Sequence, residues 1–264
     1  MRVAVFSDVH GNLTALQAVL AHLEANGPFD HIIFAGDLCL FGPRPAECIR
    51  ALRRPDIISL VGNTDLVISE ALAPPADYEA PSEERYPGLA RWTAEQLGVE
   101  AGRWLRELSE RERWRASPTG QPADDLLVTH ANPQDVHQVI FPAEARQREL
   151  YGRVRQPDAE LAPLLARLDA AALAFGHLHI PNRRFWQGKL LANISSVSLP
   201  GDGDPRAKYG VLTRAAGGRG WAAETRRVPF EAAEEMAALE AARPPGWEEQ
   251  LRQWRELGCV PQRV

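Results

Sequence analysis

Short apolar runs recur along the chain, and each is followed by a polar residue that could bind a metal ion. Their length of four or five residues predicts strands. Between the first two runs, apolar residues at helical spacing predict a helix, with Asn12 as N-cap and Gly27-Pro28 as the stop. Strands that alternate with helices predict a largely parallel sheet. The runs are 3–6, 31–35, 57–61, 126–129 and 172–175.

The rest of the chain predicts a helical insertion and a second sheet. Range 72–117 begins with several prolines and continues with amphipathic stretches at 91–97 and 103–108, so we expect a helical insertion there. Strand-like segments then recur with hairpin turns at Gln187-Gly188 and Gly217-Gly218, which predicts an antiparallel second sheet. The predicted fold class is α/β, a two-sheet β-sandwich flanked by helices (αββα) with a helical insertion. The segments are 183–186, 190–194, 211–213 and 221–228.

The polar residues that follow the runs must converge if they serve one site, so residues 1–230 are expected to form one domain. Residues 231–264 would then be a C-terminal helical appendage packed on that domain. One stripe of this appendage is apolar and either packs on the sandwich or contacts a partner, which leaves homo-oligomerisation open. The stripe contains Trp247, Leu251, Trp254 and Leu257.

Composition narrows the classes of function. Hydrophobic residues make up 45% of the 264 and charged residues 25%, which is ordinary for a globular protein with a sizeable core. The net charge of −5 argues against a nucleic-acid polymer as partner, because such binding usually needs a basic face. Three isolated cysteines (Cys39, Cys48 and Cys259) fit a reducing compartment, and the N-terminal apolar run is too short for a signal peptide or membrane span. We therefore expect a cytoplasmic protein with no membrane partner.

The residues after the runs form a ligand set of carboxylates, one amide and imidazoles. Such groups suit Mn, Fe, Zn, Co or Ni, and two cations roughly 3.5–4 Å apart are widely used to hydrolyse phosphate esters. Among these residue types a carboxylate can bridge two cations, and we assign that place to Asp37. The chain is thus predicted to be a hydrolytic metalloenzyme. The set is Asp8, His10, Asp37, Asn63, His130, His177 and His179.

Each motif has a plainer interpretation on its own. An Asp in a turn usually caps a helix, and Asn63 could close its strand in an Asx turn. The pairs Asp8-x-His10 and His177-x-His179 are more informative, because alternate residues of an extended segment face the same side and could serve one site. The combination, rather than any single motif, favours a metal centre.

The order of these motifs resembles the calcineurin-like metallophosphoesterase superfamily. Its motifs run Asp-x-His, Gly-Asp, Gly-Asn-His-Asp/Glu, a single His, and Gly-His-x-His. Further segments are similar to the compact bacterial phosphodiesterase branch, and the likeness extends over about residues 1–230. These segments are His10-Gly-Asn-Leu, Gly36-Asp-Leu-Cys-Leu-Phe-Gly-Pro43 and Asp202-Gly-Asp-Pro-Arg-Ala-Lys-Tyr209.

The resemblance implies two divalent metal ions, with Mn preferred over Fe, Zn, Ni or Co, and a small phosphate ester as substrate. A hydroxide shared by the cations would attack phosphorus in line, and the cations would neutralise the developing charge. By the same resemblance, Asp8, His10 and His179 bind one cation, Asn63, His130 and His177 bind the other, and Asp37 lies between them. The catalytic set it implies is Asp37, Asn63, His130, Thr64 and Asp65.

One departure from the family pattern concerns the leaving group. Where the fourth motif usually has His, a candidate general acid, this chain has Thr64, which cannot protonate an alkoxide at neutral pH. Asp65 would ordinarily orient that His, and a structural hydrogen bond is its simpler role here. Because the resembled branch includes non-His members that favour phosphodiesters, we predict a phosphodiesterase rather than a phosphomonoesterase.

Substrate contacts are sought in the motif loops, where a side chain could pair with phosphate or base. About two of five candidates are expected to face the pocket, because loop arginines are more often solvated. The segment 193–197 replaces the family's Asn-Pro-Gly-Ser but could still present backbone N–H groups. The candidates are Arg44, Asn132, Arg183, Arg206 and Tyr209.

Two other classes of function compete with this hydrolase. The first is a catalytically idle scaffold that binds protein partners, but family members recruited in that way have lost metal-binding histidines, which this chain keeps. The second is a metal-dependent nuclease, which would need basic segments with interleaved aromatic residues. The sequence has none of these segments.

Overall fold

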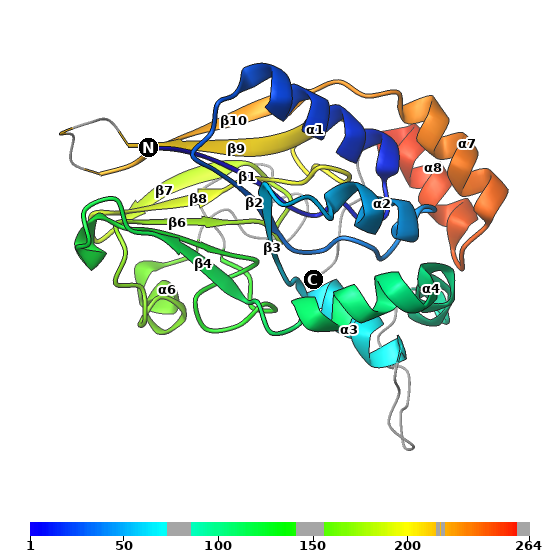
Figure 1. Ribbon diagram of the computed structural model, residues 1–264, viewed down its shortest axis with the longest axis horizontal. Helices are drawn as coiled ribbons and strands as arrows, with labels where there is room; N and C mark the ends of the chain where they lie inside the picture. Colours follow the sequence, from blue (N-terminus) through cyan, green and yellow to red (C-terminus); the bar gives the residue numbers. More distant parts are fainter. Residues whose placement is uncertain (73–85, 141–155, 215–216, 218–219, 258–264) are drawn as a thin grey trace.

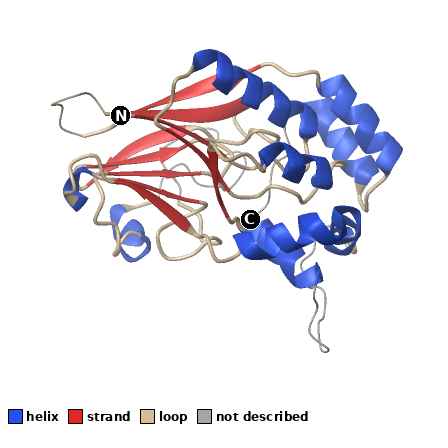
Figure 2. Cartoon of the chain, in the orientation of Figure 1, coloured by secondary structure: helices blue, strands red, loops and turns tan. Residues whose placement is uncertain are grey.

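The strands pair into two sheets that face each other, with helices on the outer faces (Figures 1 and 2). A computed structural model describes residues 1–72, 86–140, 156–214, 217 and 220–257. In spatial order, the strands of the first sheet are β10 (Ala222–Val228), β9 (Ala207–Thr213), β1 (Arg2–Phe6), β2 (His31–Ala35) and β3 (Ile57–Leu60). Those of the second sheet are β4 (Arg113–Ala116), β5 (Leu126–Thr129), β6 (Ala172–Phe175), β8 (Lys189–Asn193) and β7 (Asn182–Trp186).

Each sheet has a parallel centre and antiparallel additions. Strands β1, β2 and β3 are parallel to one another, and so are β5, β6 and β8. The predicted antiparallel second sheet is therefore wrong, because the two C-terminal hairpins join different sheets. The β7–β8 hairpin belongs to the second sheet, whereas β9 pairs with β1 in the first. A hairpin pattern specifies the local pairing of two strands but not which sheet edge they join.

The hairpin turn between β7 and β8 has the conformation that its sequence predicts. Gln187 and Gly188 both have positive φ, 47° and 77°, as a two-residue hairpin of type I′ requires. The other predicted turn, Gly217-Gly218, lies partly outside the described residues.

Alternate residues of β1 separate two apolar layers. Val3 and Val5 point into the layer between the sheets, where they join residues such as Val128 and Ala174 of the second sheet. Ala4 and Phe6 point the other way, into a layer shared with the helices. A third apolar layer lies between the second sheet and α6 (Asp158–Leu164). The order of layers is thus helices, sheet, sheet, helix, which is the predicted αββα arrangement.

Helices follow several of the strands and begin or end at the signals in the sequence. Asn12 caps α1, because its side-chain oxygen accepts the N–H of Ala15 at 2.9 Å, and Gly27 follows the last turn. The other helices are α2 (Pro45–Leu52), α3 (Asn63–Leu72), α4 (Leu89–Leu108), the 3₁₀ turn η1 (Pro122–Asp124), α7 (Ala232–Ala242) and α8 (Trp247–Leu257), with α1 spanning Leu13–Asn26.

Range 72–117 is helical only in part. Helix α4 covers both predicted amphipathic stretches, and Gly98 interrupts it between them with φ 70° and ψ 175°. This helix packs beside α3 and α2. The range ends in β4, an edge strand of the second sheet, so its last residues are not part of a helical insertion. Residues 73–85 lie outside the described part.

Helix α7 contacts the start of α1, and α8 packs against α7. Glu235 of α7 is fully buried and accepts the backbone N–H of Thr14 at 3.1 Å and its hydroxyl at 2.7 Å. On the predicted stripe of α8, Leu251 is buried, whereas Trp247 and Trp254 are half-buried. The division into residues 1–230 and 231–264 stays a prediction. Among the described helices, none combines the length and the apolar character needed to cross a membrane.

Candidate metal centre

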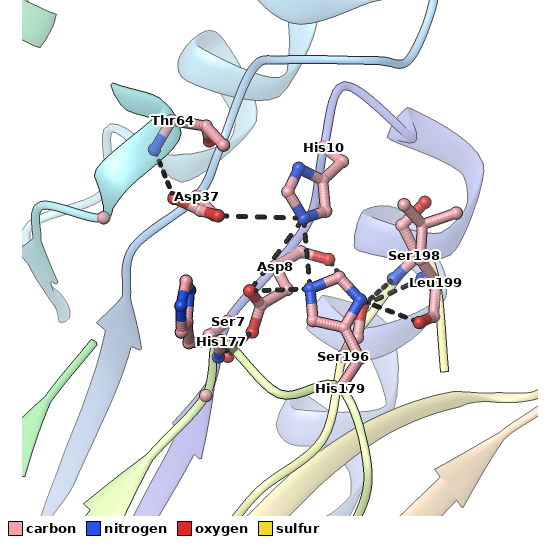
Figure 3. Close-up of polar contacts among 12 residues, drawn as sticks. Ser7, Asp8, His10, Asp37, Thr64, His177, His179, Ser196, Ser198 and Leu199 are labelled. Carbon is pink, nitrogen blue, oxygen red and sulfur yellow. Dashed lines mark hydrogen bonds and ion pairs between the residues drawn. The ribbon is translucent and has the colours of Figure 1, made fainter. Parts of the chain in front are cut away.

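The predicted ligand residues follow the parallel strands of both sheets, most of them in loops, whereas Asn63 begins α3. Most of these loops turn sharply at the ligand itself, and Figure 3 shows Asp8, His10, Asp37, His177 and His179. A positive φ is uncommon outside glycine and costs of order 1–3 kcal/mol per residue. The extended geometry expected for Asp8-x-His10 and His177-x-His179 is therefore wrong, since all four residues are left-handed. The positive φ angles are 58° at Asp8, 48° at His10, 63° at Asp37, 64° at His177 and 61° at His179.

Two groups of three residues bring their ligand atoms together, and both groups are buried. The first trio is Asp8, His10 and His179, in which Asp8 Oδ1 lies 3.0 Å from His179 Nε2 and 3.9 Å from His10 Nε2. All three residues of this trio are at most 2% exposed. The trio joins residues that follow β1 with one that follows β6, so it spans the two sheets.

The second trio is Asp37, His130 and His177. His130 Nε2 lies 3.2 Å from His177 Nδ1 and 3.5 Å from Asp37 Oδ2. Asn63 adds its amide oxygen 3.0 Å from His130 Nε2. This trio also joins the sheets, because Asp37 follows β2 whereas the histidines follow β5 and β6. The structure therefore brings together all seven residues predicted from the sequence.

Each of the four imidazoles has one ring nitrogen against a backbone carbonyl, which fixes the orientation of the ring. With the proton on that nitrogen, the other nitrogen presents a lone pair toward its trio, as metal-binding histidines usually do. The pairs are His10 Nδ1 with Leu40 O (3.1 Å), His130 Nδ1 with Ala35 O (2.8 Å), His177 Nε2 with His137 O (2.9 Å) and His179 Nδ1 with Leu199 O (2.8 Å).

This donor set fits divalent cations. The lone pairs of His10 Nε2 and His179 Nε2 face each other at 3.3 Å, an arrangement that repels without a positive charge between them. Asp37 Oδ2 is buried and has no hydrogen-bond partner among the described residues, although it lies 3.9 Å from His10 Nε2 and 3.5 Å from His130 Nε2. An oxygen between the two trios is what a bridging carboxylate would supply.

Glycines allow the ligand loops to approach this closely. A Cβ at Gly62 would collide with the carboxylate and backbone of Asp37, and one at Gly176 would collide with Ser7 and Asp8. The Gly that precedes each of Asn63 and His177 is thus needed for packing between loops, irrespective of its own φ.

Asp65 supports the loop that carries Asp37. Its buried carboxylate accepts three backbone N–H groups, from Asp37 (2.8 Å), Leu38 (2.8 Å) and Gly62 (3.0 Å). This is the structural role expected from the sequence, and a catalytic role for Asp65 stays a prediction. Thr64 is 6% exposed, and its backbone N–H donates to Asp37 Oδ1 at 2.9 Å. Its hydroxyl has no hydrogen-bond partner among the described residues.

Sequence reasoning missed the serines that hold Asp8. The hydroxyl of Ser7 and the backbone N–H of His177 both contact Asp8 Oδ2, which leaves Oδ1 toward the histidines. Ser196 Oγ donates to the backbone oxygen of Asp8 at 2.9 Å. The only sequence signal was the unusual segment 193–197, whose backbone N–H at Val197 donates to Ser7 O.

The sequence profile of the calcineurin-like phosphoesterase family matches residues 1–181. The chain belongs to this family. Its fold is similar to that of a metallophosphoesterase from Sphaerobacter thermophilus, with a TM-score of 0.69, 26% identity, and coverage of 98% of this chain and 100% of the other.

Two further proteins are also similar over nearly their whole lengths. Hypothetical protein PH1004 from Pyrococcus horikoshii OT3 has a TM-score of 0.74 at 16% identity, with 97% of this chain and 98% of that chain covered. Uncharacterized protein MJ0912 from Methanocaldococcus jannaschii is 26% identical over 265 residues, which cover 93% of this chain and 94% of the relative.

Two of the predicted substrate contacts of this phosphoesterase are engaged with other elements. Tyr209 is fully buried on β9, and its hydroxyl lies 2.9 Å from His22 Nδ1 of α1, so the substrate contact stays a prediction. Arg44 contacts Glu235 and Thr14 and lies 3.4 Å from Glu234. It therefore ties the start of α2 to α7.

The other three candidates also have protein partners. Arg183 is exposed on β7 and donates to Ala223 O at 2.7 Å, whereas exposed Arg206 pairs with Asp204 at 2.6 Å. Asn132 lies near the second trio, but its side chain is used within its own loop, where it donates to Gln138 O at 2.6 Å. The sequence could not show these protein neighbours, and the substrate contacts of the three side chains stay predictions.

Burial and neighbouring carboxylates shift the pKa values of the site histidines of this phosphoesterase in opposite directions. Burial lowers the pKa of His10 and of His177 to about 4, so both rings are neutral at physiological pH. Burial also acts to lower the pKa of His130, but Asp37 and Asp8 outweigh it and raise that pKa above 6.5. His130 therefore retains a proton at higher pH than the other two rings.

Cation binding at the second trio should release a proton at any pH below the raised pKa of His130. A ligand imidazole must be neutral, so a cation displaces the proton that His130 keeps, and affinity should rise with pH through its raised pKa. Calorimetric titration with Mn²⁺ in buffers of different ionisation enthalpy measures the released proton. His130→Asn removes the titrating ring and should abolish the buffer dependence of this release. Equal heats in all buffers for the unaltered protein would contradict the expectation.

Proposed function

We propose that this protein is a phosphodiesterase that uses two divalent cations. The first trio would hold one cation, and Asn63, His130 and His177 would hold the other, with Asp37 between them. The main support is the buried Asp37 Oδ2, which lacks a hydrogen-bond partner among the described residues and lies within 4 Å of a histidine from each trio. Mn²⁺ is the first metal to test, because imidazole and carboxylate ligands suit it.

The protein's own groups would position the metal-binding side chains and discriminate among substrates by their leaving groups. When bound, a pair of divalent cations supplies an activated water and neutralises charge on the phosphoryl group. Ser7 and the His177 backbone hold Asp8 in place, and the carbonyls behind the four rings hold the imidazoles. Thr64 occupies the position of the family's candidate acid, and its hydroxyl cannot protonate an alkoxide at neutral pH. Esters with good leaving groups would be the preferred substrates.

The preference for diesters also rests on Thr64. General acid catalysis contributes typically about 10²–10⁴-fold, and its absence slows the release of a poor leaving group most. A monoester of an aliphatic alcohol combines a poor leaving group with two negative charges, so it should be the poorest substrate. The cytoplasmic location and the preference for Mn²⁺ stay predictions from the sequence.

Purified protein loaded with Mn²⁺ should hydrolyse bis(4-nitrophenyl) phosphate far faster than glycerol 3-phosphate. Including 4-nitrophenyl phosphate separates the effect of the leaving group from that of the ester class, since it shares the leaving group of the diester. Metal analysis of the same sample should give two equivalents per chain. Faster hydrolysis of the alkyl monophosphate would contradict the diester assignment, and a chain without metal or activity would favour the scaffold. Activity on single-stranded DNA that falls steeply with salt would instead indicate a nuclease.

A further inference from the structure

The two histidines of the Gly-His-x-His motif serve different trios, and carbonyls from two different loops orient them. His177 Nε2 donates to His137 O at 2.9 Å, in the loop that follows β5. His179 Nδ1 donates to Leu199 O at 2.8 Å, in the loop that follows β8. The nitrogen that faces each trio is therefore set by the place of one carbonyl, and each carbonyl has its own supporting side chains.

Asp135 and Asn132 fix the carbonyl behind His177. Asp135 Oδ1 accepts the N–H groups of His137 (2.7 Å) and Gln138 (2.8 Å). Asn132 closes the same loop, because its Nδ2 donates to Gln138 O at 2.6 Å. Asp135 is half-buried and lies at the protein surface, so its removal leaves the apolar layers intact. Its hydrogen bonds act on the peptide whose oxygen holds the His177 ring.

Ser196 holds the backbone N–H of Leu199, the residue whose carbonyl lies behind His179. Its hydroxyl oxygen accepts the N–H groups of Leu199 (2.8 Å) and Ser198 (3.1 Å) and donates to Asp8 O at 2.9 Å (Figure 3). Ser196 is fully buried. One hydroxyl thus connects two members of the first trio, Asp8 through its backbone and His179 through Leu199.

We propose that Asp135 and Ser196 are positioning residues for two different cations. Asp135 sets the affinity of the cation held with His177, and Ser196 sets the affinity of the cation held with His179. Groups that orient a ligating imidazole typically contribute about 10- to 100-fold in metal affinity. Because the two supports lie in separate loops, each cation can be weakened without the other. This inference rests on the proposed function, since it requires two bound cations.

Mn²⁺ titration of the full chain, unaltered and as Asp135→Ala or Ser196→Ala, tests the proposal. Each variant should retain one strong equivalent and bind the other about 10- to 100-fold more weakly. Crystals equilibrated with limiting Mn²⁺ identify the site through anomalous scattering. The peak beside His177 should fall in Asp135→Ala, and the peak beside His179 should fall in Ser196→Ala. Each variant is therefore the control for the other.

A conservative variant separates hydrogen bonding from charge. Asp135→Asn keeps a carbonyl oxygen that can accept both N–H groups, so it should bind Mn²⁺ like the unaltered protein. The spin-coupled electron paramagnetic resonance signal of a Mn²⁺ pair should persist in Asp135→Asn and disappear in Asp135→Ala at limiting metal. If Asp135→Asn is as weak as Asp135→Ala, the proposal is overturned, because the negative charge would then be the cause.

Further results of these titrations would overturn either the positioning roles or the proposed function. Unchanged binding in both alanine variants, or equal weakening of both cations in either, overturns the inference. If Ser196→Ala does not fold, the comparison of the two Asp135 variants decides. An unaltered protein that binds fewer than two equivalents contradicts the proposed function itself. Two equivalents in the unaltered protein with insensitive variants contradict only the positioning roles.

Discussion

Asp37→Asn should lower kcat/KM for bis(4-nitrophenyl) phosphate by roughly 10³-fold and leave at most one tightly bound Mn²⁺ per chain. Asp37 Oδ1 accepts the Thr64 N–H, and an amide oxygen can keep that bond. The substitution thus changes mainly Oδ2, the buried oxygen between the trios, from an anionic acceptor to an NH₂ group. Two cations supply several kcal/mol of charge stabilisation to a phosphoryl transition state, and about 4 kcal/mol corresponds to that loss in rate.

Kinetics and metal analysis on the same preparation test this expectation. Asp125→Asn is a matched control, because Asp125 is also buried, at 2% exposed, but precedes β5 whereas His130 follows it. Its carboxylate pairs with Arg115 and Ser117, away from the ligand loops. The control should lose stability but keep two equivalents of Mn²⁺. Full activity in Asp37→Asn would exclude Asp37 as the bridging group.

Thr64→His should raise hydrolysis of an alkyl phosphomonoester by about 10²-fold and change hydrolysis of bis(4-nitrophenyl) phosphate little. The new imidazole can donate a proton to an alkoxide, whereas 4-nitrophenolate leaves without one. General acid catalysis spans about 10²–10⁴-fold. The lower end is expected here, because Asp65 has its carboxylate committed to three backbone N–H groups and cannot orient the ring. The backbone bond from residue 64 to Asp37 is retained.

The pH profile distinguishes acid catalysis from a general improvement of the site. For the monoester, kcat of Thr64→His should fall at high pH as the imidazole loses its proton. Thr64→Ala removes the hydroxyl without adding an acid, and it should show neither the gain nor the new limb of the profile. An equal acceleration of both substrates by Thr64→His would contradict the proposed role of this position.

Much of the candidate site could be predicted because its ligands depend on local sequence order. Apolar runs predict where strands end, and the ends of parallel strands meet, so Asp37 and His130 could be brought together without coordinates. The same reasoning could not show how the ligands turn inward. Asp8 and His177 adopt left-handed backbone conformations, which are held by contacts between loops and leave no mark in the hydrophobic pattern.

Long-range partners are what the sequence could not show. Tyr209 lies beside a motif in sequence, but its place on β9 turns the hydroxyl toward His22 of α1. Arg44 follows a motif loop as well, yet its partner Glu235 is 191 residues away. The pairing of β9 with β1 depends likewise on how the chain returns to the first sheet. Such contacts are decided by tertiary packing, which a single sequence does not reveal.

Both trios combine side chains from the two sheets, and this has a consequence for the stability of the fold. A cation in either trio would be a cross-link between the layers, located at one end of the sandwich only. Metal affinity would then add to the free energy of unfolding, since ions that bind only the folded chain stabilise it by mass action. Removal of the metal ions would weaken the contact between the two sheets before it affected either sheet alone.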